Sequence, residues 1–154
     1  MAVKWNKIYR GGVQRTTPET REIKAPPAIG PLQPGMGATI NAAGALTLVA
    51  ATDQSFYFVG EPMHGTVDDQ LAGATADTVR MYSPRSGDLY AARVVAGVAL
   101  VDDAPLTLTA SGQFKAAVVG TNKVHCYVDN PASAYPGTTP ATSVLNQLVP
   151  VKIK

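Results

Sequence analysis

The chain has 154 residues and a formal net charge of +2, with 45% apolar and 16% charged residues. This composition excludes a disordered polymer and fits one modest folded domain, while the small net charge gives no reason to expect nucleic-acid binding. The 14 glycines and 12 prolines interrupt the chain too often for long helices and favour short strands and turns.

Residues 1–39 are expected to form an extended basic arm outside the folded domain. They contain six basic and two acidic residues, a balance of +4, whereas residues 40–154 contain seven and nine, a balance of −2. The segment has no sustained period of 2 or 3.6. Prolines favour an extended, semi-stiff chain, and those of this segment are Pro18, Pro26, Pro27, Pro31 and Pro34.

The start of this arm mixes basic and aromatic side chains. Trp5 and Tyr9 are interleaved with Lys4, Lys7 and Arg10. Such a mixture suits a partner surface that is partly apolar and partly acidic. We therefore predict that such a partner surface is bound by five residues of the arm: Lys4, Trp5, Lys7, Tyr9 and Arg10. The alternative is a frayed terminus without a binding role.

Residues 40–154 are expected to form a single β domain. Short apolar segments recur roughly every ten residues and are separated by turn-forming residues, as is typical of a sandwich or barrel. The expected strands are 46–50, 55–59, 78–82, 89–95, 105–109, 112–117, 123–128 and 149–153. A helical turn at 66–77 and a short helix at 142–148 are compatible with the pattern, and 129–140 is a proline-rich loop. The predicted fold class is all-β, a small β-barrel or β-sandwich with an extended, proline-rich N-terminal arm.

Alternation assigns the faces of two of these strands. In the expected strand 105–109, Leu106 and Leu108 point the same way, and a tight hairpin follows at Ala110–Gly112. In the second, Cys126 and Val128 share one face and His125 lies on the other. We therefore expect His125 to be a surface residue.

The sequence predicts no catalytic residue, metal or cofactor. His64 and His125 belong to no HxxxH or HxH pattern, and the pairs 68–69 and 102–103 are aspartates without the ligand spacing of a calcium loop. Residues 82–88 have the composition of a β-turn. The chain is therefore predicted not to be an enzyme. The alternative, an enzyme, would need a site assembled from His64, the two aspartate pairs and Ser83.

Three further features exclude other classes of protein. The single cysteine, Cys126, excludes an intrachain disulfide. Gly35-Met36-Gly37 lacks the following helix that a phosphate-binding loop requires. No run approaches the ~18 apolar residues of a membrane span, and the start has no apolar stretch of signal-peptide length. We therefore expect no membrane partner and synthesis as a soluble cytoplasmic product.

The stretch from Asp77 to Ala117 has a distinctive order of strands and turns. A strand and a polar turn precede a strand rich in small apolar residues, and a short hairpin closes the series. The features that mark this order are Gly87-Asp88, Ala96-Gly97, Asp103-Ala104-Pro105-Leu106 and Ala110-Ser111-Gly112-Gln113-Phe114. In this order, and in the closing segment 149–153, the chain resembles the head decoration proteins of tailed phages.

The resemblance implies a structural, non-enzymatic protein of the virion. Such a protein binds the outer surface of the assembled capsid, usually as a homotrimer, and clamps neighbouring subunits of the major capsid protein. No nucleic acid, membrane or cofactor takes part. The alternative is another phage or cell-surface structural or carbohydrate-binding β module, which would normally display an exposed aromatic platform. Here the only tight aromatic cluster, Phe56-Tyr57-Phe58, lies in a run expected to be buried.

Overall fold

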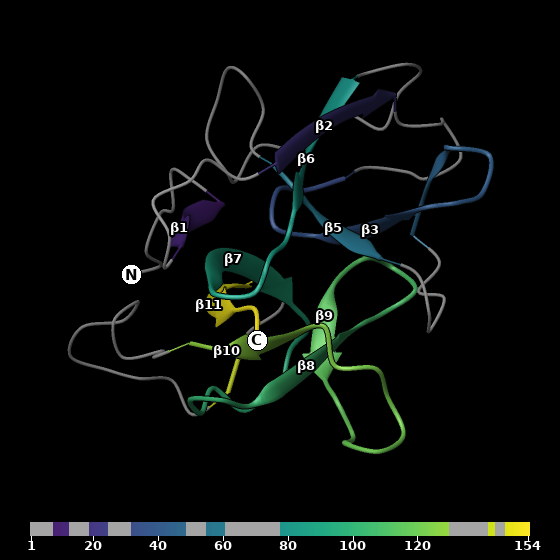
Figure 1. Cartoon of the computed structure of the whole chain (residues 1–154). Helices are drawn as coiled ribbons and strands as arrows, with labels where there is room; N and C mark the ends of the chain where they lie inside the picture. The colour runs from purple at the N-terminus through teal and green to yellow at the C-terminus, as the bar shows by residue number, and fades with distance from the viewer. Residues whose placement is uncertain are drawn as a thin grey trace.

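The structure, a computed structural model, describes residues 8–12, 19–24, 32–48, 55–60, 78–129, 142–143 and 147–154 (Figure 1). Strands are the only regular elements in these ranges, which confirms the predicted all-β class. They are β1 (Tyr9–Gly12), β2 (Glu19–Lys24), β3 (Gly37–Ile40), β4 (Leu46–Thr47), β5 (Phe56–Val59), β6 (Thr78–Ser83), β7 (Asp88–Val94), β8 (Pro105–Leu108), β9 (Phe114–Ala116), β10 (Cys126–Val128) and β11 (Gln147–Lys152).

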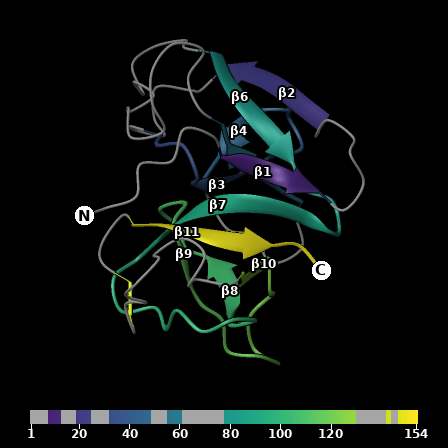
Figure 2. The same ribbon diagram turned by 90° about the vertical axis from the view of Figure 1, so that its left-hand side faces the viewer.

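The first sheet has the order β1-β7-β11-β10-β8-β9 among the described strands. Its longest pairing is antiparallel and joins β11 to β7 from Gln147↔Val94 to Lys152↔Leu89. The sheet curls until β9 returns to β7 through one parallel pair, Val94↔Phe114. The described strands therefore form a partly closed barrel, with β1 added outside it along β7 (Figure 2).

The second sheet is antiparallel and has the order β2-β6-β5-β3-β4 in the described part of the chain. Two of its inner strands, β5 and β6, have a hydrophobic cluster on each face, and their side chains alternate between these two clusters. Phe58 and Tyr82 point into the cluster against the first sheet, whereas Tyr57, Val59 and Met81 point into a cluster on the other side. This explains why the run Phe56–Val59 has no polar alternation.

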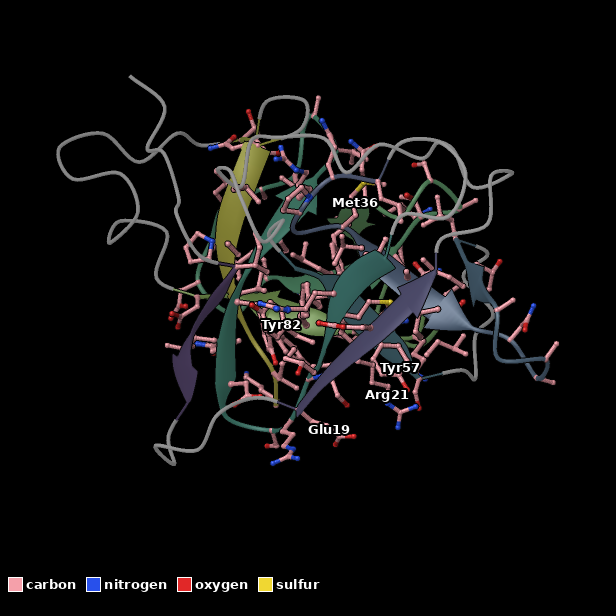
Figure 3. All side chains as sticks on the ribbon, turned by 90° about the horizontal axis from the view of Figure 1, so that it is seen from above. Glu19, Arg21, Met36, Tyr57 and Tyr82 are labelled. Carbon is pink, nitrogen blue, oxygen red and sulfur yellow. The ribbon has the colours of Figure 1, made fainter. Side chains whose placement is uncertain are left out.

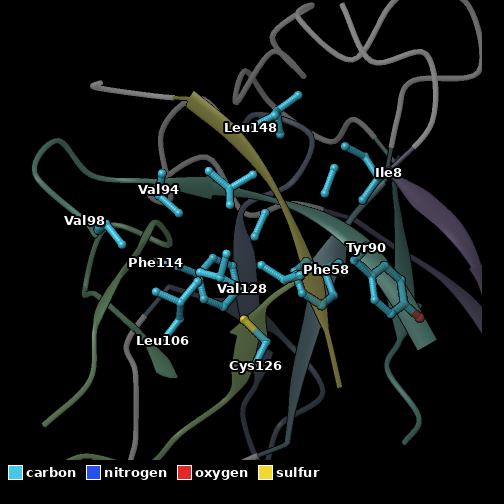
Figure 4. Packing of buried hydrophobic residues seen from close by; sticks show 14 of the residues in the cluster. Ile8, Phe58, Tyr90, Val94, Val98, Leu106, Phe114, Cys126, Val128 and Leu148 are labelled. Carbon is cyan, nitrogen blue, oxygen red and sulfur yellow. The ribbon is translucent and has the colours of Figure 1, made fainter. Parts of the chain in front are cut away.

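The main core lies between the two sheets. It is built around three aromatic rings, with the Phe58 ring 4.4 Å from that of Tyr90 and 5.4 Å from that of Phe114, both in stacked geometry (Figure 4). Phe58 comes from the second sheet, and the other two rings come from the first. The stack therefore fixes the sheets to one another through apolar burial and ring contact.

The described parts of residues 1–39 are integrated into the β domain, which departs from the expected arm outside it. β1 pairs with β7, and β2 pairs with β6 over its whole length. Ile8 is fully buried in the main core, and Leu32 and Met36 are buried in the second cluster. The boundary at 39/40 falls inside β3. Edge strands are held mainly by backbone hydrogen bonds, so their sequences need no apolar alternation.

The eight strands expected from the sequence each overlap one of the strands β4 to β11. The short helix considered for 142–148 is not formed at the described positions, because Thr142 makes a β-bridge with Ala99 and residues 147 and 148 begin β11. The helical turn considered for 66–77 and most of the proline-rich loop at 129–140 lie outside the described residues.

Gly35 and Gly37 let the chain before β3 approach the first sheet closely. A Cβ on Gly37 would lie 2.2 Å from a methyl group of Leu108, and Gly35 adopts a φ of +87°. The carbonyl of Gly35 accepts the Arg93 N–H at 2.8 Å. The buried Arg93 side chain also donates from Nε to the carbonyl of Pro34 at 2.7 Å. These glycines therefore serve packing between the sheets.

Candidate functional site

The five residues predicted to bind a partner are only partly placed by the structure. Lys4, Trp5 and Lys7 lie outside the described residues. Tyr9 and Arg10 belong to β1, where Tyr9 is paired with Tyr90 of β7. β1 is the outermost described strand on its side of the first sheet. β1 therefore forms this edge of the first sheet in the described part of the chain.

The charged residues of β2 pair with one another and with the adjacent strand. Glu19 is 3.3 Å from Arg85 and 3.7 Å from Arg21, and Glu22 is 3.7 Å from Arg80. The Arg21 guanidinium also lies over the Tyr57 ring, 5.5 Å from its centroid (Figure 3). Exposed pairs of this kind contribute only about 0.2–1 kcal/mol each. Three guanidinium groups thus share two carboxylates, so this group of exposed side chains keeps a net charge of +1.

His125 is buried, with 9% of its surface exposed, so the expectation of a surface histidine is wrong. Regular pairing of β10 begins one residue later, at Cys126, and contacts with β8 and with Phe56 cover the ring. Its Nδ1 accepts the Leu108 N–H at 3.3 Å and is 3.3 Å from the Thr107 hydroxyl, while the Phe56 ring packs edge-on. Burial, reinforced by Lys123, lowers the pKa of His125 to about 4.

The low pKa of His125 should make the fold sensitive to mild acid. Unfolding restores the ordinary pKa near 6.5, so the neutral ring contributes fully above pH 6.5 and its contribution is lost as the pH falls towards 4. After discounting for partial solvation we expect a loss of about 2 kcal/mol in the free energy of unfolding. The measurement is urea unfolding at pH 7.5 and pH 4.5.

His125→Asn is the matched control, because an asparagine side-chain oxygen can accept the Leu108 N–H but does not titrate. The variant should lose much less stability than the wild type between the two pH values. The bonds from Lys152 and Lys154 lower the pKa of Asp103. The contribution of Asp103 to stability is therefore lost only at pH values below the ordinary carboxyl pKa, outside the interval from pH 7.5 to pH 4.5. An equal loss in both proteins would rule out His125 as the source.

Cys126, Asp102 and Asp103 have structural roles. Cys126 is fully buried, and burial raises the pKa of its thiol, which disfavours the thiolate required of a nucleophile.

Asp102 and Asp103 lie in a turn, as expected, and Asp103 has a positive φ of 65°. Lys152 Nζ is 2.8 Å from Asp103 and 3.3 Å from Asp102. No group of three possible metal ligands occurs among the described residues; His64, Asp68 and Asp69 are not among them.

The turn predicted at 82–88 joins β6 to β7, with residues 84–87 outside both strands. The Asp88 carboxylate accepts the Arg85 N–H at 3.1 Å and the Tyr90 hydroxyl at 3.2 Å. The Asp88 N–H donates back to the Arg85 carbonyl at 3.0 Å. The polar side chain of Asp88 is therefore used to close the turn and to anchor the aromatic stack.

Three valines in two segments of the described chain are exposed, a feature that the sequence did not predict. Val101, Val118 and Val119 are 62%, 63% and 74% exposed and are the exposed large apolar residues of the described part. Val101 begins the turn before β8, and the loop after β9 carries the other two. The Ala117 N–H donates to the Pro105 carbonyl at the start of β8, and the Ala104 N–H donates to the Val101 carbonyl within the turn. The two segments form the lower end of the molecule in Figures 1 and 2.

No protein-family model matches this chain, and no curated protein matches it. The described residues include no helix long and apolar enough to cross a membrane.

Proposed function

We propose that this chain is a decoration protein of a tailed-phage head. It binds the outer surface of the capsid as a homotrimer and stabilises contacts between major capsid subunits. Its role is structural and involves no catalysis, cofactor, nucleic acid or membrane.

The observation that carries this proposal is the stretch 77–117, with its resemblance to head decoration proteins. From Thr78 onward it folds as four successive strands, β6 to β9. A turn closed by Asp88 joins β6 to β7, and a hairpin at 109–113 joins β8 to β9, with the Thr109 N–H donating to the Gln113 carbonyl at 2.8 Å. The order of strands and turns on which the resemblance rests is thus an order of folded elements.

The physical requirements of the role suit a small rigid β module. A protein that binds only the assembled shell stabilises that shell by mass action. Several weak contacts made by one oligomer raise the effective concentration of each remaining contact. Lys4, Trp5 and Lys7, which precede β1 in the sequence, would supply one such contact.

The second candidate is a structural or carbohydrate-binding module of another phage component or of a cell surface. A glycan platform needs exposed aromatic rings, and Tyr57 and Phe58 are buried in opposite clusters while Phe56 is half-buried against the main core. This placement favours the capsid proposal over a glycan platform at this run.

Deleting residues 1–7 should weaken attachment to empty heads built from the major capsid protein and leave the domain folded. The deletion removes Lys4, Trp5 and Lys7 but keeps Ile8 and the described strands. Trp5→Ala alone should weaken attachment by about 2 kcal/mol or more, because a buried interfacial tryptophan is a common hot spot. Attachment of the full chain should also fall with added salt, since exposed charge pairs are screened beyond about 8–10 Å. Co-sedimentation with empty heads measures these effects.

Thermal unfolding is the control for this deletion, and the midpoint should be unchanged. Deleting residues 1–24 would not serve, because it would also remove β1, β2 and the buried Ile8. Unchanged attachment after deletion of residues 1–7 would show that the start of the chain does not bind the shell.

A further inference from the structure

β2 is the longest and most regular of the sheet edges in the described part of the chain. It pairs with β6 at six consecutive positions without a break in register (Figure 2). At the other end of the second sheet, β4 has only two residues, and the register of β1 in the first sheet shifts between Tyr9 and Gly11. Short strands and bulges are common ways to protect a sheet edge from further pairing. β2 has neither protection.

The backbone polar groups of alternate β2 residues point away from β6. The Arg80 carbonyl accepts the Gly60 N–H at 2.8 Å, so the backbone groups of Arg80 face the β5 side of the sheet. Glu22 is the register partner of Arg80 on β2. Opposite residues of an antiparallel pair turn their backbone groups either both toward each other or both away. The N–H and C=O of Glu22, and those of Thr20 two positions earlier, therefore point outward at the edge.

The side chains around this edge carry an excess of positive charge. Three guanidinium groups share two carboxylates, which leaves a net charge of +1, and the residues are Arg21, Arg80, Arg85, Glu19 and Glu22. The Arg21 side chain is 51% exposed. A second copy of the chain would bring a group of the same sign to this edge, which is unfavourable across an interface. A segment that carries a carboxylate would neutralise the excess.

We propose that β2 accepts an extended acidic segment of another protein as an additional antiparallel strand. The outward N–H and C=O groups of Thr20 and Glu22 would bond to the backbone of that segment, the usual source of affinity when a peptide extends a sheet. A carboxylate opposite Arg21 would lie in the closer, non-hydrogen-bonded type of pair. An apolar side chain opposite Ile23 would extend the second hydrophobic cluster, against which Ile23 packs.

Amide chemical shifts of the full chain, titrated with a synthetic peptide, test this docking surface. The probe is acetyl-Thr-Val-Thr-Glu-Thr-Thr-amide. When it lies antiparallel to β2, its glutamate is opposite Arg21 and its valine is opposite Ile23. We expect a dissociation constant on the order of 1 mM, with the largest shifts at the amides of Thr20 and Glu22. The same peptide methylated at the backbone nitrogens of its third and fifth residues should not bind, because those nitrogens would face Glu22 and Thr20.

Exchanging charges tests the pairing with Arg21. A peptide with lysine in place of the glutamate should bind at least about threefold more weakly, because like charges directly opposite one another are unfavourable. The Arg21→Glu variant should reverse this preference and bind the lysine peptide more tightly than the glutamate peptide. Circular dichroism establishes that the variant is folded.

Thr20→Pro tests the outward backbone groups. The variant should lose binding of the glutamate peptide and keep its thermal unfolding midpoint, because the N–H that proline removes makes no bond to β6. Thr20→Val keeps that N–H and should retain binding, which separates the backbone from the side chain.

Three results would overturn the inference. The first is the absence of shifts up to about 10 mM peptide, roughly ten times the expected dissociation constant. The second is equal binding of the glutamate and lysine peptides, or shifts confined to residues away from β2. The third comes from sedimentation velocity of the chain alone, because self-association that Thr20→Pro abolishes would show that a second copy occupies this edge.

This inference does not depend on the capsid role, and co-sedimentation with empty heads distinguishes the two. Weaker attachment of Thr20→Pro to heads would support the docking surface and assign the acidic segment to the major capsid protein. Peptide binding at β2 with unchanged attachment would support the docking surface for a different partner. Peptide binding by a wild-type chain that does not attach to heads would refute the capsid role and support the docking surface.

Discussion

Replacing Phe58 by alanine should lower the free energy of unfolding by about 3–5 kcal/mol. Phe58 is fully buried and stacks on Tyr90 at 4.4 Å and on Phe114 at 5.4 Å. It is the ring that the second sheet inserts between these two rings of the first. Removing it leaves a cavity between the sheets, where the backbone of both sheets limits collapse. Because small domains have only about 5–15 kcal/mol of stability, the loss should be evident in urea unfolding.

Phe56→Ala is the matched control, two residues earlier on β5 and on the same side. Its ring contacts Phe58 and Phe114 edge-on but is only half-buried. We expect a clearly smaller loss, because less apolar area leaves water on folding. Equal losses for the two variants would contradict the placement of Phe58 at the centre of the junction between the sheets.

Gly35→Ala should cost about 2–4 kcal/mol, because a backbone penalty and an overlap act together. Gly35 has a φ of +87°, and a Cβ there would lie 2.6 Å from a methyl group of Leu148 and 2.9 Å from the Ala91 carbonyl oxygen. That carbonyl belongs to β7 and cannot move without disturbing the first sheet. Urea unfolding again provides the measurement.

Gly97→Ala separates the two causes. Gly97 has nearly the same φ, +82°, but a Cβ there would meet nothing within 4 Å. The substitution should cost only about 1 kcal/mol, the penalty of the left-handed backbone conformation. If Gly35→Ala cost no more than Gly97→Ala, the close approach of the Gly35 segment to β7 would be refuted.

The strands of the second half of the chain could be predicted because one face of each packs on a core while turn residues mark the ends. Leu106 and Leu108 are both buried, as their alternation indicated, and the hairpin after them has Gly112 at a φ of +80°. Aspartates also mark the ends of strands: the Asp88 side chain, at the start of β7, accepts the Arg85 N–H, and Asp103 adopts a φ of 65° in the turn before β8.

The first forty residues could not be predicted in this way. β1 and β2 lie at sheet edges, where backbone pairing holds a strand whose side chains show no apolar period. Ile8 and Leu32 are isolated apolar residues whose burial depends on which strands they meet. Their sequence neighbours are prolines, glycines and charges, which favour an extended chain without indicating what it packs against.

The exposure of Val101, Val118 and Val119 was also beyond sequence reasoning. Val101 and Val118 are far apart in the sequence, and only the pairing of β8 with both β9 and β10 brings their segments to one end. His125 illustrates the same limit. Its burial follows from contacts with Thr107, Leu108 and Phe56, which alternation along one strand does not predict.

Electron microscopy of virus particles that carry this protein tests the capsid role most directly. We predict ordered density for the β domain on the outer surface of the head, at positions related by the shell symmetry and in contact with more than one major capsid subunit. Heads without such density, or density for this chain confined to another part of the virion, would contradict the capsid role.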